Sequence, residues 1–426
     1  MMMRNVTSGE AFGDRGDRAL DRPVRVLMVC PRYLPEVGGT ETHVHEVGRR
    51  LSGLRGFEIT VLATDRSRRL PRQEVVEGTS VLRVPSWPRR RDYYLAPGIA
   101  AVIRQRRWDL VHCQGIHTPV PLLAMISARR AGIPYLVTFH TGGHSSRLRN
   151  AMRATQWRLA GPLLRNAVSL IAVSHFEAAA LSRHARLGDK RVVVIRNGGA
   201  LPSPRAGTVA VPGRIVSSGR LERYKGHHRV IEALPHVMRE IPEAHLLILG
   251  SGPYKSNLYQ LARHLGVADR VSIRYVAPAD RQGMATTLAE SSVVAALSDY
   301  EAHPVAVMEA LCVGRPVVGY DIAGLGELFA AGWVRGLPRG APATAVAQEL
   351  VKAMSSPSPV DHAQLPSWDS CADQLAHLYL SSVGIAAACS DHYSVESAAR
   401  PDPPRSPAPR PGGRDDRDLP SCRLSE

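Results

Sequence analysis

The chain has little cysteine for its length, and none of it is arranged as a site. Six cysteines, at positions 30, 113, 312, 371, 389 and 422, are scattered over 426 residues with no Cys-x-x-Cys pair and no Cys/His ligand spacing. This pattern is typical of reduced thiols in a cytoplasmic protein and argues against a disulfide framework or a zinc site. We expect no metal ion and no other cofactor.

The chain also lacks long apolar segments. No run approaches the ~18 residues of a membrane span, and residues 1–22 mix Gly, Arg and Asp without the apolar core of a signal peptide. Residues 387–426 are rich in Pro, Arg, Gly and Asp. Both segments are predicted to be disordered tails, and Asp416-Arg417-Asp418 is interpreted as solvated charge and not as a metal site.

Aromatic residues make up 5% of the chain, while 44% is apolar, and 426 residues suffice for two domains with a core each. The net charge of +16 predicts an acidic partner: a nucleotide diphosphate, an anionic membrane surface or a nucleic acid. Nucleic acid is disfavoured, because the arginines fall in separate loops and tails without interleaved aromatics or a recognition motif.

The first half of the chain alternates apolar strands with helical segments. Residues 24–30 form an apolar run that leads to Gly38-Gly39 and a helix that Thr40 or Thr42 would cap. Glycines at such a turn let the backbone approach a phosphate closely, although a plain turn is the commoner explanation of the pair.

Two further strands end in side chains suited to a ligand. His140 ends an apolar strand at its carboxyl end, where open α/β sheets bind ligands. Gly219-Arg220 follows another apolar run, and Lys225 comes five residues after Arg220. Two fixed cations at this place would stabilise the negative charge that builds on a departing phosphate.

The stretch 298–320 holds two carboxylates eight positions apart, Glu301 and Glu309. Pro304 suits the first turn of a helix, so Glu301 is predicted to precede that helix and Glu309 to lie within it. A helix start attracts phosphate through its unpaired amides and dipole, and acids beside it suit sugar hydroxyls. Gly314 is predicted to end the helix before a buried parallel strand.

Together these segments resemble the retaining glycosyltransferases of family 4. Residues 301–320 resemble the E-x7-E motif with its trailing ALCVGRPVV, residues 219–226 the G-R-L-x-x-x-K-G motif, and PEVGGTETHV the glycine loop. The resemblance covers about residues 24–382 and implies the GT-B fold, an α/β fold of two Rossmann-like domains facing across a cleft.

The implied domains are an acceptor domain at 23–200, a linker at 201–213, a nucleotide-sugar domain at 214–360 and a terminal helix at 361–386 that returns to the first domain. The catalytic residues that the resemblance implies are Arg220, Lys225, His140 and Glu301. The implied donor-binding residues are Gly38, Gly39, Gly219, Val276, His303, Pro304, Val305 and Glu309.

In two places the chain departs from the family pattern. HTGGHSS follows the strand where His-Asp is commoner, which affects the acceptor side, and Ala302-His303 stand where Gly-Phe is common. We expect His303 to lie close to the sugar or phosphate of the donor and to influence donor preference.

The implied activity is transfer of a sugar from a nucleotide diphosphate to an acceptor hydroxyl, with an α-glycosidic product formed by front-side displacement. The acceptor is a glycan, a lipid-linked glycan or a small molecule. Two alternatives stay open: a catalytically silent nucleotide-sugar-binding protein and a sugar-nucleotide epimerase on the same fold. Neither the sugar, the nucleotide nor the acceptor follows from the sequence.

Residues 147–165 form a basic amphipathic segment. Leu148, Met152, Leu159 and Leu163 share a helical face, with arginines off it and Trp157 among them. One interpretation is a helix that lies on an anionic membrane at the inner face of the plasma membrane. The other, which we prefer, is a helix that packs within its domain and exposes a basic face.

Overall fold

The computed structural model describes residues 22–54, 56–88, 94–105, 108–141, 147–356 and 361–384, with the side chains of 147–154 excepted. The predicted tails at 1–21 and 387–426, including Asp416-Arg417-Asp418, lie outside the described residues, as does most of the segment that follows His140. Arg22, the last residue of the predicted N-terminal tail, lies within the described residues, and its Nη2 lies 2.7 Å from Oδ1 of Asp109.

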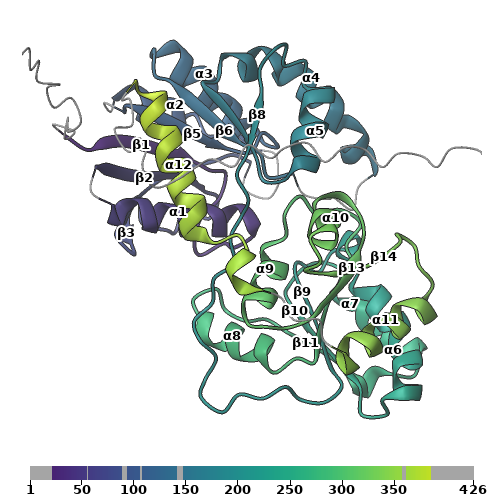
Figure 1. The fold of residues 1–426 in the computed structure, drawn as a ribbon. Helices are drawn as coiled ribbons and strands as arrows, with labels where there is room; N and C mark the ends of the chain where they lie inside the picture. The colour runs from purple at the N-terminus through teal and green to yellow at the C-terminus, as the bar shows by residue number, and fades with distance from the viewer. Residues whose placement is uncertain are drawn as a thin grey trace, which may run out of the picture. The chain divides into compact units, whose positions relative to one another are not determined.

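The first part of the chain builds an eight-stranded sheet in the order β3-β4-β2-β1-β5-β6-β7-β8 (Figure 1). Its strands are β1 (Val24–Val29), β2 (Phe57–Asp65), β3 (Gln73–Val76), β4 (Thr79–Pro85), β5 (Leu110–Gln114), β6 (Tyr135–Thr138), β7 (Ser169–Ala172) and β8 (Val192–Val194). All neighbours pair in parallel except β3 and β4. The central strands β1, β5 and β6 are buried along almost their whole length because helices cover both faces.

The antiparallel hairpin of β3 and β4 is the part of this sheet that the sequence analysis did not identify. Its turn is formed by Glu77 and Gly78, whose φ angles of 44° and 82° are both left-handed. Such a two-residue turn matches the twist of a hairpin. The short β3 exposes every second residue at the sheet edge, so its apolar pattern is too weak to distinguish from a loop.

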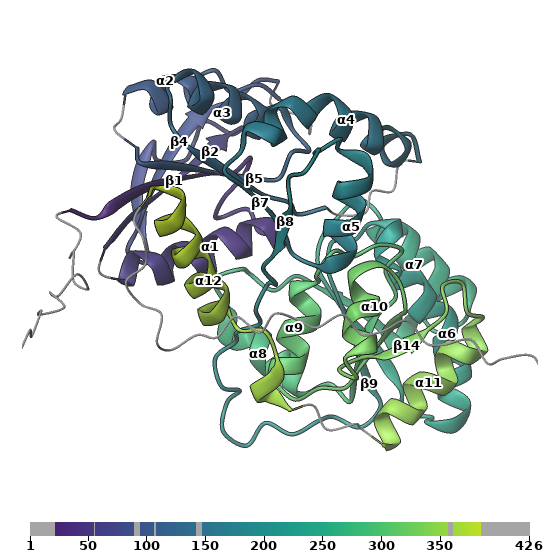
Figure 2. The ribbon, with the colours of Figure 1, turned by 45° about the horizontal axis from the view of Figure 1, so that its top comes forward.

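Helices cover both faces of the first sheet (Figure 2). They are α1 (Gly39–Gly53), α2 (Gly98–Gln105), α3 (Pro119–Arg130), α4 (Arg147–Asn166) and α5 (His175–His184). α2, α3, α4 and α5 share one apolar core with the sheet, and α1 lies in the core of the opposite face.

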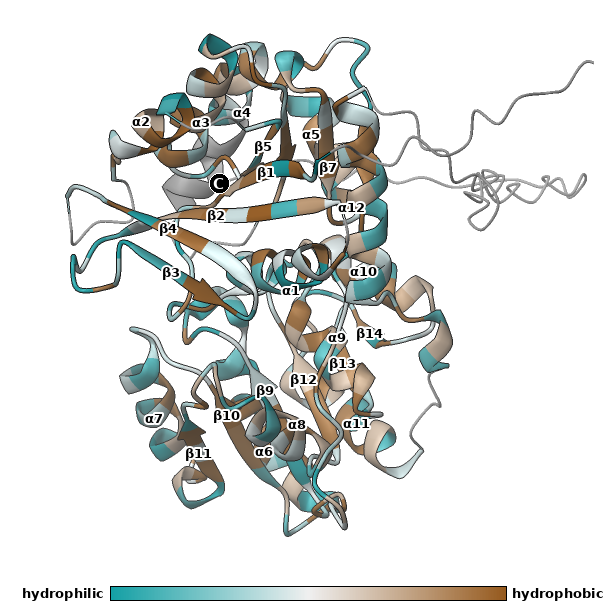
Figure 3. Cartoon of the chain, turned by 90° about the vertical axis from the view of Figure 1, so that its left-hand side faces the viewer, coloured by the Kyte–Doolittle hydropathy of each residue, from teal (hydrophilic) through white to brown (hydrophobic). Residues whose placement is uncertain are grey.

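The second part builds a six-stranded, fully parallel sheet in the order β11-β10-β9-β12-β13-β14. The strands are β9 (Arg214–Ser218), β10 (His245–Leu249), β11 (Val271–Arg274), β12 (Val293–Ala296), β13 (Val317–Tyr320) and β14 (Arg335–Leu337). β10 is strongly apolar in Figure 3, as expected of a strand buried between helices, whereas β11 at the sheet edge exposes every second residue.

Helices again cover both faces of this sheet. They are α6 (His227–Glu240), α7 (Lys255–His264), α8 (Arg281–Ala289), α9 (Val305–Cys312), α10 (Ala323–Ala330) and α11 (Ala343–Ser355), with short 3-10 turns η1 (Arg223–Lys225), η2 (Ala268–Arg270) and η3 (His362–Gln364). α6, α7 and α11 share one core with the sheet, and α8, α9 and α10 share the other. The expected α/β class with two parallel sheets is confirmed.

The last described helix, α12 (Trp368–Ser382), packs on the first sheet and lies beside α1 (Figure 1). Trp368 and Tyr379 are fully buried in the same core as β1. The Tyr379 hydroxyl also lies 2.6 Å from Nδ1 of the buried His112 on β5. This contact joins residues 267 positions apart and holds α12 against β5 of the first sheet.

Two expectations about helices were wrong. Neither Thr40 nor Thr42 caps α1, because the helix begins at Gly39 with Gly38 as its N-cap and no side-chain cap bond. In α4, Trp157 is buried at 3% exposure, while Leu159 is 78% exposed. The side of α4 that faces the core runs through Trp157, Ala160 and Leu164, with Leu163 of the predicted face packed beside them.

The burial of Trp157 shows that α4 packs within its domain through this residue, so the tryptophan cannot act as a membrane anchor. The side chains of Leu148 and Met152 lie outside the described residues. Across the part of the chain that the structure describes, no helix combines the length and apolarity that a bilayer crossing requires.

Candidate functional site

The carboxyl ends of β9 and β12 bring two sequence-predicted residues into direct contact. Nζ of Lys225 lies 2.6 Å from Oε1 of Glu301, and Ser298 donates its hydroxyl to the same oxygen at 2.8 Å. Burial lowers the pKa of Lys225, but the Glu301 carboxylate more than offsets this, so the pKa of Lys225 is raised above its ordinary value. The lysine is therefore charged and oriented at neutral pH.

The turn after β9 depends on glycine. Gly219 has φ 148°, and a side chain on Gly250 would lie 2.0 Å from the Gly219 carbonyl oxygen. Gly226 has φ 77°, and a Cβ there would lie 1.9 Å from the carbonyl oxygen of Leu297. These close approaches seat η1, which ends in Lys225, directly against the end of β12.

Arg220 lies beside this pair and is held by two other side chains. Its Nη2 donates to the Tyr224 hydroxyl at 2.6 Å, and its Nη1 lies 3.2 Å from Glu222. The side chain is half exposed. The site thus contains one buried cation paired with Glu301 and one half-exposed cation, whose planar donor group is held by Tyr224 and Glu222.

The predicted helix after Glu301 is present as α9, with Pro304 as N-cap and Val305 as its first residue. Glu301 precedes the helix and Glu309 lies within it, as expected. His303 is buried at 4% exposure, and neither ring nitrogen has a hydrogen-bond partner among the described residues. Burial, with the nearby Arg196, lowers the pKa of His303 to about 3, so the imidazole is neutral.

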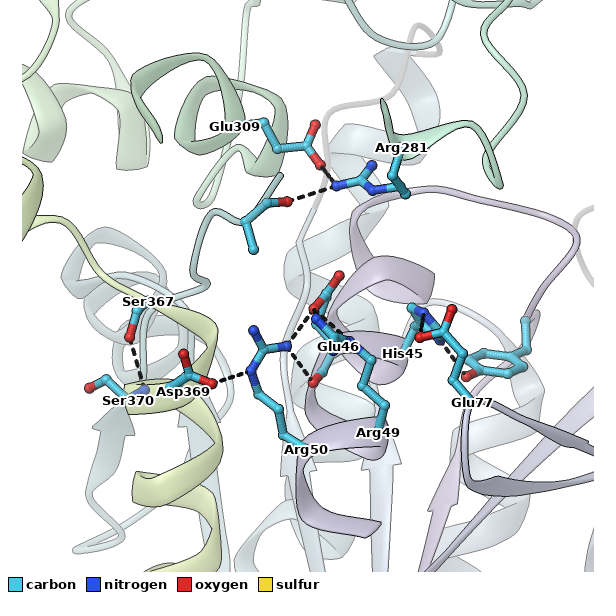
Figure 4. Close-up of polar contacts among 12 residues, drawn as sticks. His45, Glu46, Arg49, Arg50, Glu77, Arg281, Glu309, Ser367, Asp369 and Ser370 are labelled. Carbon is cyan, nitrogen blue, oxygen red and sulfur yellow. Dashed lines mark hydrogen bonds and ion pairs between the residues drawn. The ribbon is translucent and has the colours of Figure 1, made fainter. Parts of the chain in front are cut away.

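Glu309 is paired with a residue that the sequence analysis did not single out. Arg281, the first residue of α8, donates Nη2 to Oε1 of Glu309 at 2.6 Å (Figure 4). The same nitrogen donates to the Ala200 carbonyl oxygen at 3.0 Å. Burial raises the pKa of Glu309, and Arg281 opposes that rise.

In the first sheet, the end of β6 carries His140. Its Nε2 donates to the Gln114 side-chain oxygen at 2.8 Å, and its ring meets that of His43 edge-on at 4.7 Å between centroids. His43 in turn donates Nδ1 to the Asn197 side chain at 2.9 Å. Burial, and then the neighbouring His43, lower the pKa of His140, so this ring is neutral too.

Gly38 and Gly39 open α1, and their surroundings differ. A Cβ on Gly38 would lie 2.7 Å from the Glu41 carboxylate, whereas a Cβ on Gly39 would meet nothing within 4 Å. Glu41 is buried and accepts a bond from Arg32 at 3.1 Å. An alanine at Gly38 would therefore require the Glu41 side chain to move, while Gly39 leaves open space before the helix start.

A hydrogen bond links the segment after His140 to the segment before Glu301. The Tyr300 hydroxyl donates to Oγ1 of Thr141 at 3.0 Å. The backbone N–H of Thr141 donates to the buried carboxylate of Glu177 at 2.7 Å, and the Thr141 hydroxyl donates to the same oxygen. Phe176 packs edge-on against the Tyr300 ring. Thr141 and Tyr300 each adjoin a predicted site residue in the chain.

The structure thus brings Lys225 and Glu301 together and leaves Arg220 beside them. Val276 follows β11 and is partly buried against the core of α8 and α9, with no polar contact to Glu309. Among the described residues, no group of three or more His, Cys, Asp or Glu side chains is placed to hold a metal ion.

Residues that sequence reasoning missed are Arg281, Tyr300, Thr141, Glu177 and Ser298. Tyr300 and Ser298 lie within three residues of Glu301 in the chain, so their proximity to a predicted site residue could have identified them. Nothing in the sequence points to Arg281 or Glu177, because no spacing rule relates them to their partners.

Comparison with known proteins supplies the family. Residues 37–199 match the model described as "Glycosyltransferase Family 4", and residues 210–362 match "Glycosyl transferases group 1". The chain is 30% identical over 338 residues to a glycogen synthase of Mycobacterium tuberculosis, covering 71% of this chain and 80% of that protein. It is 28% identical over 412 residues to a D-inositol 3-phosphate glycosyltransferase of Nocardiopsis dassonvillei, covering 84% and 94%.

Solved structures show the same fold. A sucrose-phosphate synthase of Thermosynechococcus elongatus superposes with a TM-score of 0.70 at 20% identity, covering 85% of this chain and all of that one. HepE of Anabaena, crystallised in complex with UDP-glucose, superposes with a TM-score of 0.59 at 21% identity, covering 85% of this chain and 96% of that one. The two parallel sheets are therefore those of the GT-B fold, and the chain is a glycosyltransferase that belongs to family 4.

Proposed function

We propose that this glycosyltransferase uses a nucleoside diphosphate sugar as donor and forms an α-glycosidic bond with retention of configuration at the anomeric carbon. The observation that carries the proposal is the contact between Lys225 and Glu301, with Arg220 beside it, at the carboxyl ends of adjacent strands. A positioned cation pair at this edge is what departure of a diphosphate requires.

In the proposed reaction, the bond between the anomeric carbon and the donor phosphate oxygen breaks. The acceptor oxygen bonds to the same face of that carbon, and the acceptor proton passes to the departing phosphate oxygen. Lys225 and Arg220 stabilise the charge on the diphosphate. Glu301 orients Lys225 through its bonded oxygen, and its other oxygen is assigned to a sugar hydroxyl.

The remaining residues position the two substrates. The α9 start at Pro304 and Val305, with His303, is proposed to receive the sugar and phosphate, and Glu309 the ribose. Gly219 and Gly39 would let backbone approach the phosphates, Val276 would meet the base, and His140 would contact the donor sugar. With two cations at the diphosphate, we propose that no metal ion is required.

The nucleotide is proposed to be UDP or GDP. HepE of Anabaena was crystallised with UDP-glucose, and a relative from Komagataeibacter xylinus is named as a GDP-mannose:cellobiosyl-diphosphopolyprenol alpha-mannosyltransferase. We propose a glycan, lipid-linked or small-molecule acceptor and a cytoplasmic site of action. Association with the inner face of the plasma membrane would use the exposed Arg158, Leu159 and Arg165 of α4.

Thermal melting of the full chain with UDP-, GDP- and ADP-sugars tests donor binding, because a ligand that binds only the folded state raises the melting temperature. One donor should shift the wild type and shift Lys225→Ala and Glu309→Ala less. NMR of the transfer product would then fix the anomeric configuration. A β-linked product would contradict retention, and a bound donor never consumed with any acceptor panel would favour a silent nucleotide-sugar-binding protein.

A further inference from the structure

One nitrogen of the partly exposed Arg281 donates hydrogen bonds to two acceptors. Nη2 donates to Oε1 of Glu309 at 2.6 Å and to the carbonyl oxygen of Ala200 at 3.0 Å. Figure 4 shows Arg281 pointing directly at Glu309. Its side chain is one-third exposed, while that of Glu309 is 9% exposed. The arginine therefore covers one oxygen of a nearly buried carboxylate.

The start of α8 is built to hold this arginine in place. Asp280 caps the helix by accepting from the backbone N–H of Gly283 at 2.8 Å. A Cβ on Gly283 would lie 2.1 Å from the Asp280 carboxylate, so a side chain at this position would displace the capping carboxylate. Because the cap fixes the first turn, Arg281 leaves the helix in a defined direction and loses little additional freedom on pairing with Glu309.

The second partner of Arg281 lies on the segment that connects the two sheets. Ala200 follows Gly199, where a Cβ would lie 2.6 Å from the Met308 carbonyl oxygen and 2.7 Å from Sγ of Cys312. This segment is thus pressed against α9, the helix that carries Glu309. Next in α8, Gln282 donates to the Ser203 carbonyl oxygen at 2.8 Å. Arg281 and Gln282 together tie α8 to the connection.

Arg281 takes up one oxygen of Glu309 and leaves the other for a ligand. Since Oε1 accepts from Arg281, a hydroxyl donor from a bound molecule is directed to Oε2. A carboxylate with one oxygen fixed by an arginine presents the other in a single orientation, which favours discrimination between hydroxyl positions.

We infer that Arg281 is a positioning residue that determines recognition of the donor's ribose, by orienting the Glu309 carboxylate toward the ribose hydroxyls. This inference rests on the proposed function, in which Glu309 receives the ribose. Arg281 does not contact the reacting atoms, so its loss affects donor affinity and ribose selectivity and not the chemical step.

Titration calorimetry of the full-length protein with UDP or GDP, whichever nucleotide the wild type binds, and with its 2′-deoxy and 3′-deoxy analogues, tests the inference. The wild type should bind the ribonucleotide at least ~10-fold more tightly than one of the analogues. This ratio is the affinity difference expected from one oriented hydrogen bond to a charged group. Arg281→Gln should reduce this ratio to about 2-fold, and Arg281→Lys should retain part of it, because lysine keeps the charge without the planar fork.

Two further variants separate orientation from stability. Glu309→Gln should lose the same selectivity, and Arg281→Gln combined with Glu309→Gln should lose no more than either alone, since both act through one carboxylate. Arg214→Gln is the matched control: Nη1 of Arg214 lies 2.6 Å from Glu290, but Arg214 lies at the amino end of the central strand β9 and not at the carboxyl ends where the site lies. It should lower the melting temperature and leave the ribose ratio at its wild-type value.

The two proposals fail in different ways. If the wild type binds no nucleoside diphosphate or nucleotide sugar, the proposed function is wrong and the inference falls with it. If the wild type discriminates between ribose and deoxyribose but Arg281→Gln keeps the full affinity ratio, the contact between Arg281 and Glu309 is only a structural ion pair. A lack of ribose discrimination in the wild type would also overturn the inference while leaving the transferase proposal intact.

Discussion

Nζ of Lys225 lies 2.6 Å from Oε1 of Glu301, although the two residues are 76 positions apart in the chain. Both side chains are mostly buried, at 18% and 13% exposure. Such a pair costs desolvation on both sides, so it is retained where each charge is needed in a fixed position. The pair joins the end of η1 to the loop before α9, the two segments assigned to the diphosphate and to the sugar.

Lys225→Met should lower kcat by about 10²–10³-fold, because it removes a cation aimed at the charge that develops on the leaving group. It should also lower the unfolding free energy, since Glu301 is left partly buried without its partner. Adding Glu301→Gln to Lys225→Met should restore stability but not activity. Steady-state kinetics and urea unfolding measure the two effects.

The control for Lys225 is Lys255→Met, which removes an exposed lysine from the start of α7 in the same half of the protein. Its kcat should stay within about 2-fold of the wild type. Equal activity of Lys225→Met and wild type would remove the lysine from the proposed mechanism.

Tyr300→Phe should lower kcat more than it lowers stability. The substitution deletes the hydroxyl that donates to Thr141 and keeps the ring that packs on Phe176. Because Tyr300 precedes Glu301 and Thr141 follows His140, loss of this bond should loosen both site residues. A double-mutant cycle with Thr141→Val should give a coupling free energy of about 1 kcal/mol in kcat/KM.

Tyr135→Phe provides the comparison for Tyr300, because it deletes a hydroxyl that donates to the Leu163 carbonyl oxygen inside the first core. It should lower the unfolding free energy and leave kcat unchanged. A coupling free energy near zero between Tyr300 and Thr141 would show that their bond plays no part in turnover.

His303→Phe should make folding less sensitive to acid. Burial lowers the pKa of His303 to about 3, so between about pH 6.5 and pH 3 the unfolded chain binds a proton that the folded chain does not. Stability is therefore lost as the pH falls through this range. At pH 5 the loss from this one residue amounts to about 2 kcal/mol relative to pH 8.

Urea unfolding at pH 8 and pH 5 measures this difference, which should be smaller by about 2 kcal/mol in His303→Phe. The exposed His377 on α12 is the control, and His377→Phe should leave the difference unchanged. The burial argument fails if His303→Phe and wild type lose the same stability between the two pH values.

Gly39→Ala should weaken donor binding by at least ~10-fold without destabilising the fold. The reason is that the added methyl group would block close approach of a phosphate to the backbone. A Cβ at Gly39 meets nothing within 4 Å in the protein. Gly53→Ala, at the other end of α1, is equally uncrowded and should leave binding unchanged. Calorimetry with the donor nucleotide compares the two, and unchanged binding in Gly39→Ala would exclude Gly39 from the phosphate site.

The sequence alone determined the features that depend on local pattern. Apolar runs between glycine turns predicted the parallel strands, and Pro304 predicted the start of α9, because strand burial and the fixed φ of proline act over a few residues. The family and the GT-B fold followed from motifs whose order along the chain is itself a local property. The short hairpin of β3 and β4 was not predicted, since the residues of β3 have the pattern of an exposed edge strand.

Only the tertiary structure decided which charges and hydroxyls meet. Arg281 reaches Glu309 from 28 positions away and Tyr300 reaches Thr141 from 159, and no helical or strand period encodes such separations. The same holds for α4, where a helical wheel placed Leu159 on the packed face, but the sheet receives Trp157. Which side of a helix is buried depends on where the rest of the chain lies, and that is fixed only when the sheet has formed.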